Sequence, residues 1–152
     1  MQRALRSEFG SQSIYALLPA ITRDRELRRL LVELRGQQKQ HVEILRGVIE
    51  SLGGRTPRSR WRRSVAAWAL FATVPILGLR FSLRLCEEAA ATVARWHAEY
   101  ALHLAEHGHT SQAIACQTIS RQRLAQHWAL RAWTENFPSG GPPGGGGQER
   151  DR

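Results

Sequence analysis

The sequence predicts an all-α protein built as a bundle of four helices, with a long connection between the second and the third. The chain is rich in Ala, Leu and Arg and poor in alternating β-branched residues, which favours helices. Apolar residues recur at steps of three and four along 23–52 and 82–108, the spacing of a buried helix face. We expect one domain over 1–136 and a flexible Gly/Pro-rich tail at 137–152.

The first two predicted helices span 3–18 and 23–52. The first ends close to Pro19, and the second is closed by the glycine pair that follows it. The apolar stripe of the second helix contains two polar residues, Gln38 and His41. Polar residues are unusual on a core-facing stripe, so they mark the centre of the bundle as a candidate site.

The connection to the third helix contains an apolar stretch at 64–79, directly after an arginine-rich segment. It is too short to cross a bilayer, which needs about 20 apolar residues, and Pro75 interrupts it. We expect 58–81 to lie across one end of the bundle as an apolar flap. Helices at 82–108 and 111–136 complete the fold, and we expect 82–108 to pack against 23–52. Four helices joined by one long crossover form a ferritin-like bundle.

Five short motifs follow one another in order along residues 6–131. They are EFGSQSIY at 8–15, QKQH at 38–41, Pro57 with Trp61 and the ILG of 76–78, Cys86 with Ala91 and His97, and LAQH at 124–127. In order and spacing this set resembles the demethoxyubiquinone hydroxylase family. The resemblance implies a ferritin-like, membrane-bound monooxygenase that uses a carboxylate-bridged di-iron centre to hydroxylate a polyprenylated quinone precursor.

The resemblance assigns six metal-ligand positions, of which three keep a ligand. The remaining ligands are Glu8, His41 and His127, and the degraded positions are Gln38, Ala91 and Leu124. Three further residues stand near the expected site: Tyr15, Glu87 and His97. Oxygen-activating iron favours carboxylate and imidazole ligands, and an amide or an alkyl group cannot replace a bridging carboxylate. We therefore expect a non-catalytic relative without a cofactor. The alternative is an active, divergent di-iron or mononuclear-iron monooxygenase acting on a ubiquinone precursor.

The net charge of +9 is concentrated between Ser51 and Cys86, where seven arginines occur and no acidic residue. Because the arginines adjoin an apolar stretch, the pattern favours an anionic membrane surface over nucleic acid. The residues expected to face the membrane are Arg58, Arg60, Trp61, Arg62, Arg63, Trp68 and Phe71. With the resemblance, this predicts peripheral attachment at the cytoplasmic face of a bacterial inner membrane or at the mitochondrial inner membrane. The expected partners are a polyprenyl quinone or lipid, quinone-biosynthesis proteins and a second copy of the chain.

Overall fold

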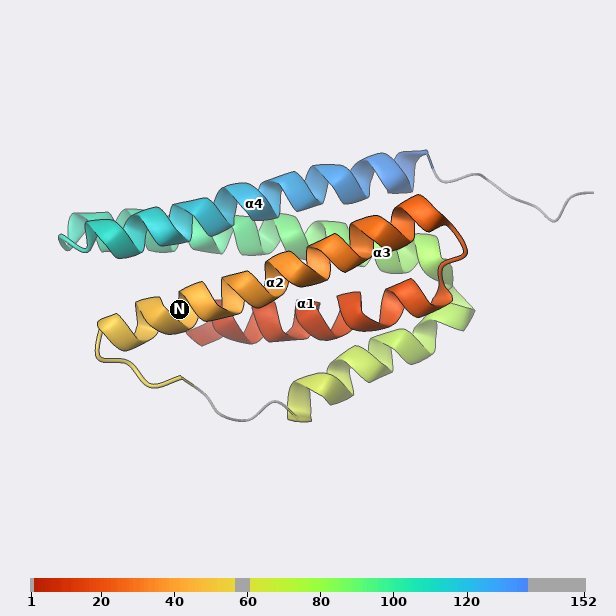
Figure 1. The fold of residues 1–152 in the computed structure, drawn as a ribbon, viewed down its shortest axis with the longest axis horizontal. Coiled ribbons are helices and arrows are strands. Elements are labelled where there is room, and N and C mark those ends of the chain that lie inside the picture. Colours follow the sequence, from red (N-terminus) through yellow and green to blue (C-terminus); the bar gives the residue numbers. More distant parts are fainter. Residues whose placement is uncertain (1, 57–60, 137–152) are drawn as a thin grey trace, which may run out of the picture.

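Four helices make up the fold: α1 (Gln2–Ile21), α2 (Arg25–Ser51), α3 (Trp61–Glu106) and α4 (Thr110–Glu135) (Figure 1). The computed structural model describes residues 2–56 and 61–136. No strand occurs in these two ranges. The all-α class and the four-helix architecture predicted from the sequence are therefore confirmed.

Both ends of α2 follow from local chemistry. The carboxylate of Asp24 accepts hydrogen bonds from the backbone N–H groups of Glu26 and Leu27, at 2.8 and 2.9 Å. Such an N-cap typically stabilises a helix by about 1 kcal/mol. At the other end Gly53 has a φ of 72°, and its N–H donates to the carbonyl of Glu50. A left-handed glycine is a common helix terminator, as the sequence indicated here.

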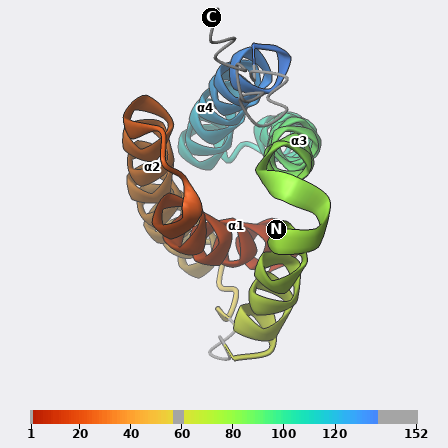
Figure 2. The same ribbon diagram turned by 90° about the vertical axis from the view of Figure 1, so that its right-hand side faces the viewer.

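A bend at Gly78 divides α3 into two parts. Gly78 has φ 82° and ψ 158°, a backbone conformation that only glycine adopts without strain. The apolar stretch at 64–79 and the predicted helix at 82–108 are thus consecutive parts of one element, and the first part swings away from the bundle (Figure 2). Among the described residues, no helix is long and apolar enough to cross a membrane.

The residues predicted to face the membrane belong to the first part of α3 and to the segment before it. Arg58 and Arg60 lie outside the described residues. The other five, Trp61, Arg62, Arg63, Trp68 and Phe71, are described only as helical backbone in the first part of α3. The interfacial role of this segment stays a prediction.

The helices pack in the order α2, α1, α3, α4 around the bundle. α1 packs against α2 and α3, whereas α4 packs against α3 and less extensively against α2. Short turns make α1 and α2, and likewise α3 and α4, antiparallel neighbours. The long crossover returns the chain along the bundle, so α2 and the second part of α3 run in the same direction (Figure 1). These two parallel helices occupy diagonal corners (Figure 2). The expectation that 23–52 packs directly against 82–108 is therefore wrong, although both helices contribute to one core cluster.

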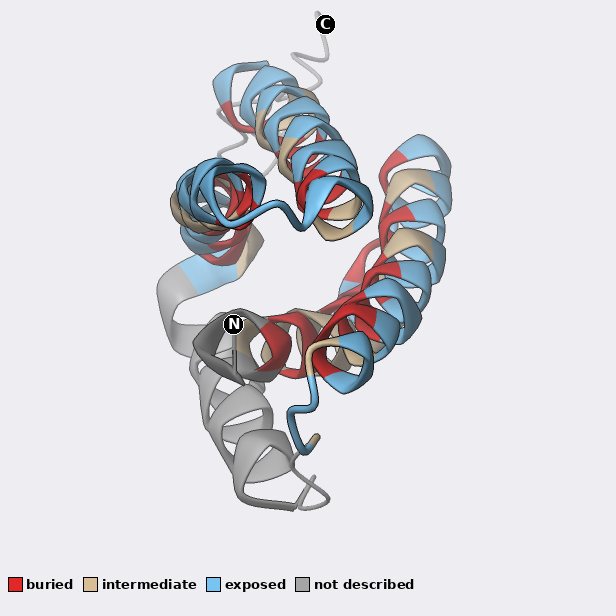
Figure 3. Ribbon diagram, turned by 90° about the vertical axis from the view of Figure 1, so that its left-hand side faces the viewer, coloured by how far each residue is buried: buried red, intermediate tan, exposed pale blue. Residues whose placement is uncertain are grey.

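The buried residues lie on the sides of the helices that face one another (Figure 3). One apolar cluster includes Tyr15, Leu31 and Leu130, and another includes Phe9 and Ile119. On α2 and α4, the buried residues that lie between these two clusters along the chain are all polar. The middle of the bundle is therefore the position where a site would lie.

Candidate functional site

Four fully buried polar side chains, one from each helix, meet in the middle of the bundle. They are Glu8, His41, His97 and Arg123, each exposing 1% or less of its surface. The carboxylate of Glu8 accepts two hydrogen bonds from Arg123, from Nε to Oε1 at 3.0 Å and from Nη2 to Oε2 at 2.5 Å. This is the bidentate pairing in which a guanidinium holds a carboxylate most strongly.

Two histidines contact the carboxylate of Glu8. Nε2 of His97 is 3.3 Å from Oε1 of Glu8, and Nδ1 of His41 is 3.4 Å from Oε2. The His41 contact is not a well-formed hydrogen bond, and Nδ1 of His97 also lacks a partner among the described residues. The other ring nitrogen of His41 donates to Oε1 of Gln122 at 2.7 Å, because an amide oxygen can only accept.

The electrostatics of the cluster are governed by the guanidinium. Burial alone would raise the pKa of Glu8, but Arg123 and the two histidines outweigh burial and hold this pKa well below its usual range. Burial lowers the pKa of His97, and the neighbouring Glu8 offsets this only in part. Glu8 is therefore ionised and His97 neutral at pH 7, and Arg123 supplies a full positive charge that balances Glu8.

Glutamine side chains extend the cluster from α4 to α2. Oε1 of Gln126 accepts hydrogen bonds from Arg123, at 3.1 Å, and from Gln38, at 3.0 Å. Nε2 of Gln126 donates to Oε1 of Gln37 at 2.7 Å. Gln38, which stands at an expected ligand position, is thus a structural link between α2 and α4.

A second polar group lies about three turns away from this cluster along α3 and about one to three turns away along α4. Oγ1 of Thr134 donates to the Glu87 carboxylate at 3.1 Å, and Nδ1 of His127 lies 3.9 Å from the same carboxylate. Nδ1 of His127 is also 3.3 Å from the backbone carbonyl of Glu87. His127 is therefore paired with α3 and does not contact Glu8 in the described structure.

The expected convergence of the six ligand positions is only partial. Glu8, Gln38 and His41 meet at the centre, whereas Ala91 is partly buried and Leu124 is 47% exposed. Leu124 points outward because the inner face of α4 follows Ile119, Arg123, Gln126 and Leu130, one residue out of register with the motif. Of the three residues expected near the site, His97 contacts Glu8, Tyr15 lies in an apolar cluster and Glu87 pairs with His127 and Thr134.

These residues do not fit a di-iron centre. Both oxygens of Glu8, the expected ligand from α1, are occupied by the guanidinium of Arg123. Among the described residues, Glu8 is the only carboxylate in the central cluster. A coupled pair of iron ions needs bridging carboxylates. The charge that a metal would supply at this position is already supplied by Arg123.

Arg123 was missed as a site residue, although the sequence contained a signal for it. It continues the stripe of Cys116, Ile119 and Leu130, which are all buried. A charged residue on an apolar stripe must either be exposed or have a buried partner of opposite charge. Glu8 is that partner.

A second candidate site lies at the end of α3. Within the described part of the chain, His103, Glu106 and His107 form a group whose ligand atoms all lie within 4.8 Å of one another. The metal ligands predicted from the sequence did not include this group. The spacing H-x-x-E-H, which places three ligands on one helix face, was the available signal.

An apolar surface groove of about 510 Å³ runs between α2 and α4 near the chain's described end. It is lined by Glu26, Leu30, Ala129, Ala132, Trp133 and Asn136. The groove is separate from the central cluster and shares no lining residue with it.

No protein-family model, no curated protein and no solved structure matches this chain. The resemblance to the quinone hydroxylases therefore rests on the five sequence motifs.

Proposed function

We propose that the protein is a non-catalytic, peripheral membrane protein, diverged from the demethoxyubiquinone hydroxylases, that binds an anionic bilayer. The observation that carries this proposal is an exposed apolar and basic surface on α4. Leu124 and Trp128 are 47% and 55% exposed, and no acidic residue occurs between His107 and Thr134.

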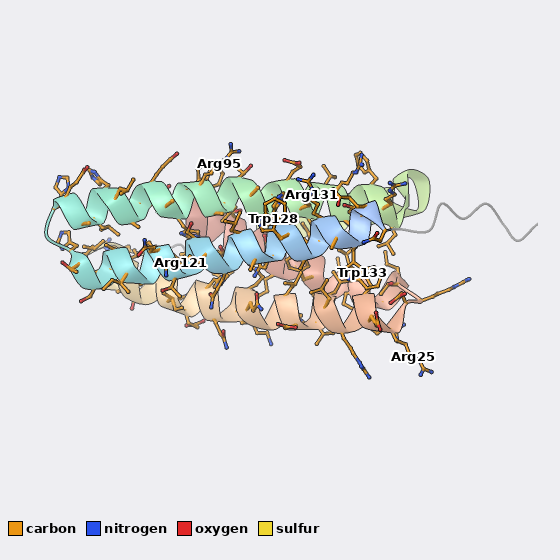
Figure 4. All side chains as sticks on the ribbon, turned by 90° about the horizontal axis from the view of Figure 1, so that it is seen from above. Arg25, Arg95, Arg121, Trp128, Arg131 and Trp133 are labelled. Carbon is orange, nitrogen blue, oxygen red and sulfur yellow. The ribbon has the colours of Figure 1, made fainter. Side chains whose placement is uncertain are left out.

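This surface, which we call the α3–α4 outer face, comprises Arg95, Arg121, Leu124, Trp128 and Arg131. On α4 the four residues are spaced by three or four positions, so they share one side of the helix. The guanidinium of Arg131 lies over the Trp128 ring, 5.4 Å from its centroid. Figure 4 looks onto α3 and α4 and labels Arg121, Trp128 and Arg131 along α4 and Arg95 at the edge of α3.

The chemistry of the face suits a lipid headgroup region. Tryptophan favours the boundary between headgroups and acyl chains, and arginine is attracted to anionic lipid. Arg131 is already paired with Glu135, at 2.7 Å. Arg95 and Arg121 have no ion pair with any described residue, so their charges are available to the membrane.

Two further features support the non-catalytic and lipid-binding parts of the proposal. The Glu8–Arg123 pair closes the centre of the bundle, where an oxygenase would hold its metal. The groove beside Leu30 and Trp133 has the apolar lining that an isoprenoid or acyl chain requires. A polyprenyl quinone or a lipid is therefore the proposed small-molecule ligand.

Vesicle flotation tests the proposal. The full chain should float with phosphatidylglycerol-containing vesicles and much less with pure phosphatidylcholine vesicles. Each arginine near an anionic surface contributes about 1 kcal/mol. The double variant Arg95→Gln/Arg121→Gln should therefore bind about thirtyfold more weakly, and Trp128→Ser should also lose affinity.

The matched control is Arg29→Gln/Arg35→Gln, which removes the same charge from exposed positions of α2. It should bind vesicles like the unaltered chain. Equal losses in both double variants would show that net charge alone drives binding and would contradict the proposed face. Binding to DNA without binding to vesicles would identify nucleic acid, and not a membrane, as the anionic partner. Stoichiometric iron in protein purified with iron would contradict the non-catalytic centre.

A further inference from the structure

The last turn of α3 and the residue that follows it present three metal-ligating side chains on one exposed surface. His103, Glu106 and His107 are spaced at i, i+3 and i+4, which places them on the same side of a helix. The ring centroids of the two histidines are 4.3 Å apart. Nδ1 of His103 is 4.0 Å from Oε2 of Glu106, and both side chains are 72% exposed. Three donors are therefore gathered where an ion has direct access from solvent.

A backbone hydrogen bond prepares His107 for this role. Nδ1 of His107 lies 2.8 Å from the backbone carbonyl of His103. A carbonyl oxygen only accepts, so Nδ1 carries the hydrogen and Nε2 of the neutral ring keeps its lone pair. Metal-bound histidines usually donate their second ring nitrogen to a carbonyl or a carboxylate in this way, which fixes the tautomer and the ring orientation.

The helix end itself favours a cation. α3 ends at Glu106, and Gly108 follows with a φ of 77°. The carbonyl end of a helix carries a partial negative charge that stabilises positive ions within its last turn. Glu106 has no ion pair with Lys or Arg among the described residues, so no basic side chain competes for its carboxylate.

We propose that His103, Glu106 and His107 bind one divalent transition-metal ion, with Zn²⁺ as the favoured ion. Imidazole suits zinc, copper and nickel, whereas Mg²⁺ and Ca²⁺ prefer sites made of oxygen ligands. Two imidazoles, one carboxylate and one water complete the tetrahedral arrangement that Zn²⁺ adopts. The site is independent of the central Glu8–Arg123 cluster and of the α3–α4 outer face.

Equilibrium dialysis of the untagged full chain against Zn²⁺ tests this site. The unaltered chain should bind one equivalent of Zn²⁺. Loss of an outer-shell partner commonly lowers metal affinity 10- to 100-fold, so loss of a direct ligand should cost at least about tenfold. His103→Ala and His107→Ala should each show this loss, and Glu106→Gln should weaken binding in the same direction.

His109→Ala is the matched control, because it removes an exposed histidine two residues beyond the group. Its affinity should equal that of the unaltered chain. In imidazole ¹⁵N NMR spectra, Zn²⁺ should shift the resonances of His103 and His107 and leave His109 unchanged. Far-UV circular dichroism should show equal helicity in every variant.

Three results would overturn the assignment. One is no Zn²⁺ binding above the buffer background. The second is unchanged affinity in the His103→Ala/His107→Ala double variant, which would place the ion elsewhere. The third is half an equivalent per chain together with a zinc-dependent dimer, which would mean that two chains share the ligands.

Discussion

Replacing Arg123 with methionine should destabilise the protein severely. The side chain is 1% exposed and makes two hydrogen bonds to the equally buried Glu8. Methionine fills a similar volume but leaves the Glu8 carboxylate buried without its counter-charge. Removing one partner of a buried ion pair typically costs about 3–5 kcal/mol. Since whole domains are stable by only about 5–15 kcal/mol, this loss is a large share of the total.

A double-mutant cycle separates the pair from the surrounding packing. Glu8→Leu should lose a similar amount, because it leaves a buried guanidinium unpaired. The double variant Glu8→Leu/Arg123→Met should lose far less than the sum, because an apolar pair of similar volume replaces a buried ion pair at little cost. Arg121→Met, on the exposed side of the same helix, is the control and should change stability by less than about 0.5 kcal/mol.

Urea unfolding followed by far-UV circular dichroism measures all four variants. The prediction is refuted if Arg123→Met lowers the free energy of unfolding by less than about 1 kcal/mol, or if the two single losses add to the double loss within about 0.5 kcal/mol. Either outcome would mean that the guanidinium does not neutralise Glu8 in the folded protein.

Four further predictions concern the pH dependence of stability, the α2 N-cap and the two cysteines. The free energy of unfolding should fall as the pH drops from 7 to 5, because the unfolded chain protonates His97 and the folded protein, where burial lowers this pKa, does not. The free energy of unfolding should fall again below about pH 4. There the unfolded chain protonates Glu8, whereas the folded protein, in which the pKa of Glu8 is lowered, does not. A urea midpoint that stays constant with pH would refute both pH predictions. Asp24→Ala should lower stability by about 1 kcal/mol through loss of the α2 N-cap, visible as a lower melting temperature, while Asp24→Asn should retain most of it. Cys86 and Cys116 should resist iodoacetamide at pH 8 until the protein unfolds, because burial raises their pKa values to about 12 and about 11; rapid labelling of the native protein would contradict this.

The helices could be predicted from the sequence because their signals are local. The ends of α2 follow from Asp24 and the glycine pair, and its stripe placed Gln38 and His41 in the core. The neighbours of each helix could not be predicted in this way. Periodicity shows which face of α2 is buried but not which helices cover that face. The sequence-based prediction that α3 packs against α2 was wrong, because α1 and α4 do so.

Only some of the residues at the centre of the bundle were predicted from the sequence. His41 was found through both its place on the apolar stripe and the resemblance, and Glu8 was found through the resemblance alone. Arg123 was passed over because the motif directed attention to Leu124 and His127, its neighbours on the helix. The bundle follows the packing register, and in that register the inward residue is the arginine.

The Glu8–Arg123 pair also determines what the fold depends on in a cell. A bundle held by metal loses its central charge whenever the metal is scarce, chelated or oxidised. Here the central cation is a side chain and is present as soon as the chain has been synthesised. We therefore expect chelators and iron limitation to leave this central ion pair in place, because its positive charge is part of the chain.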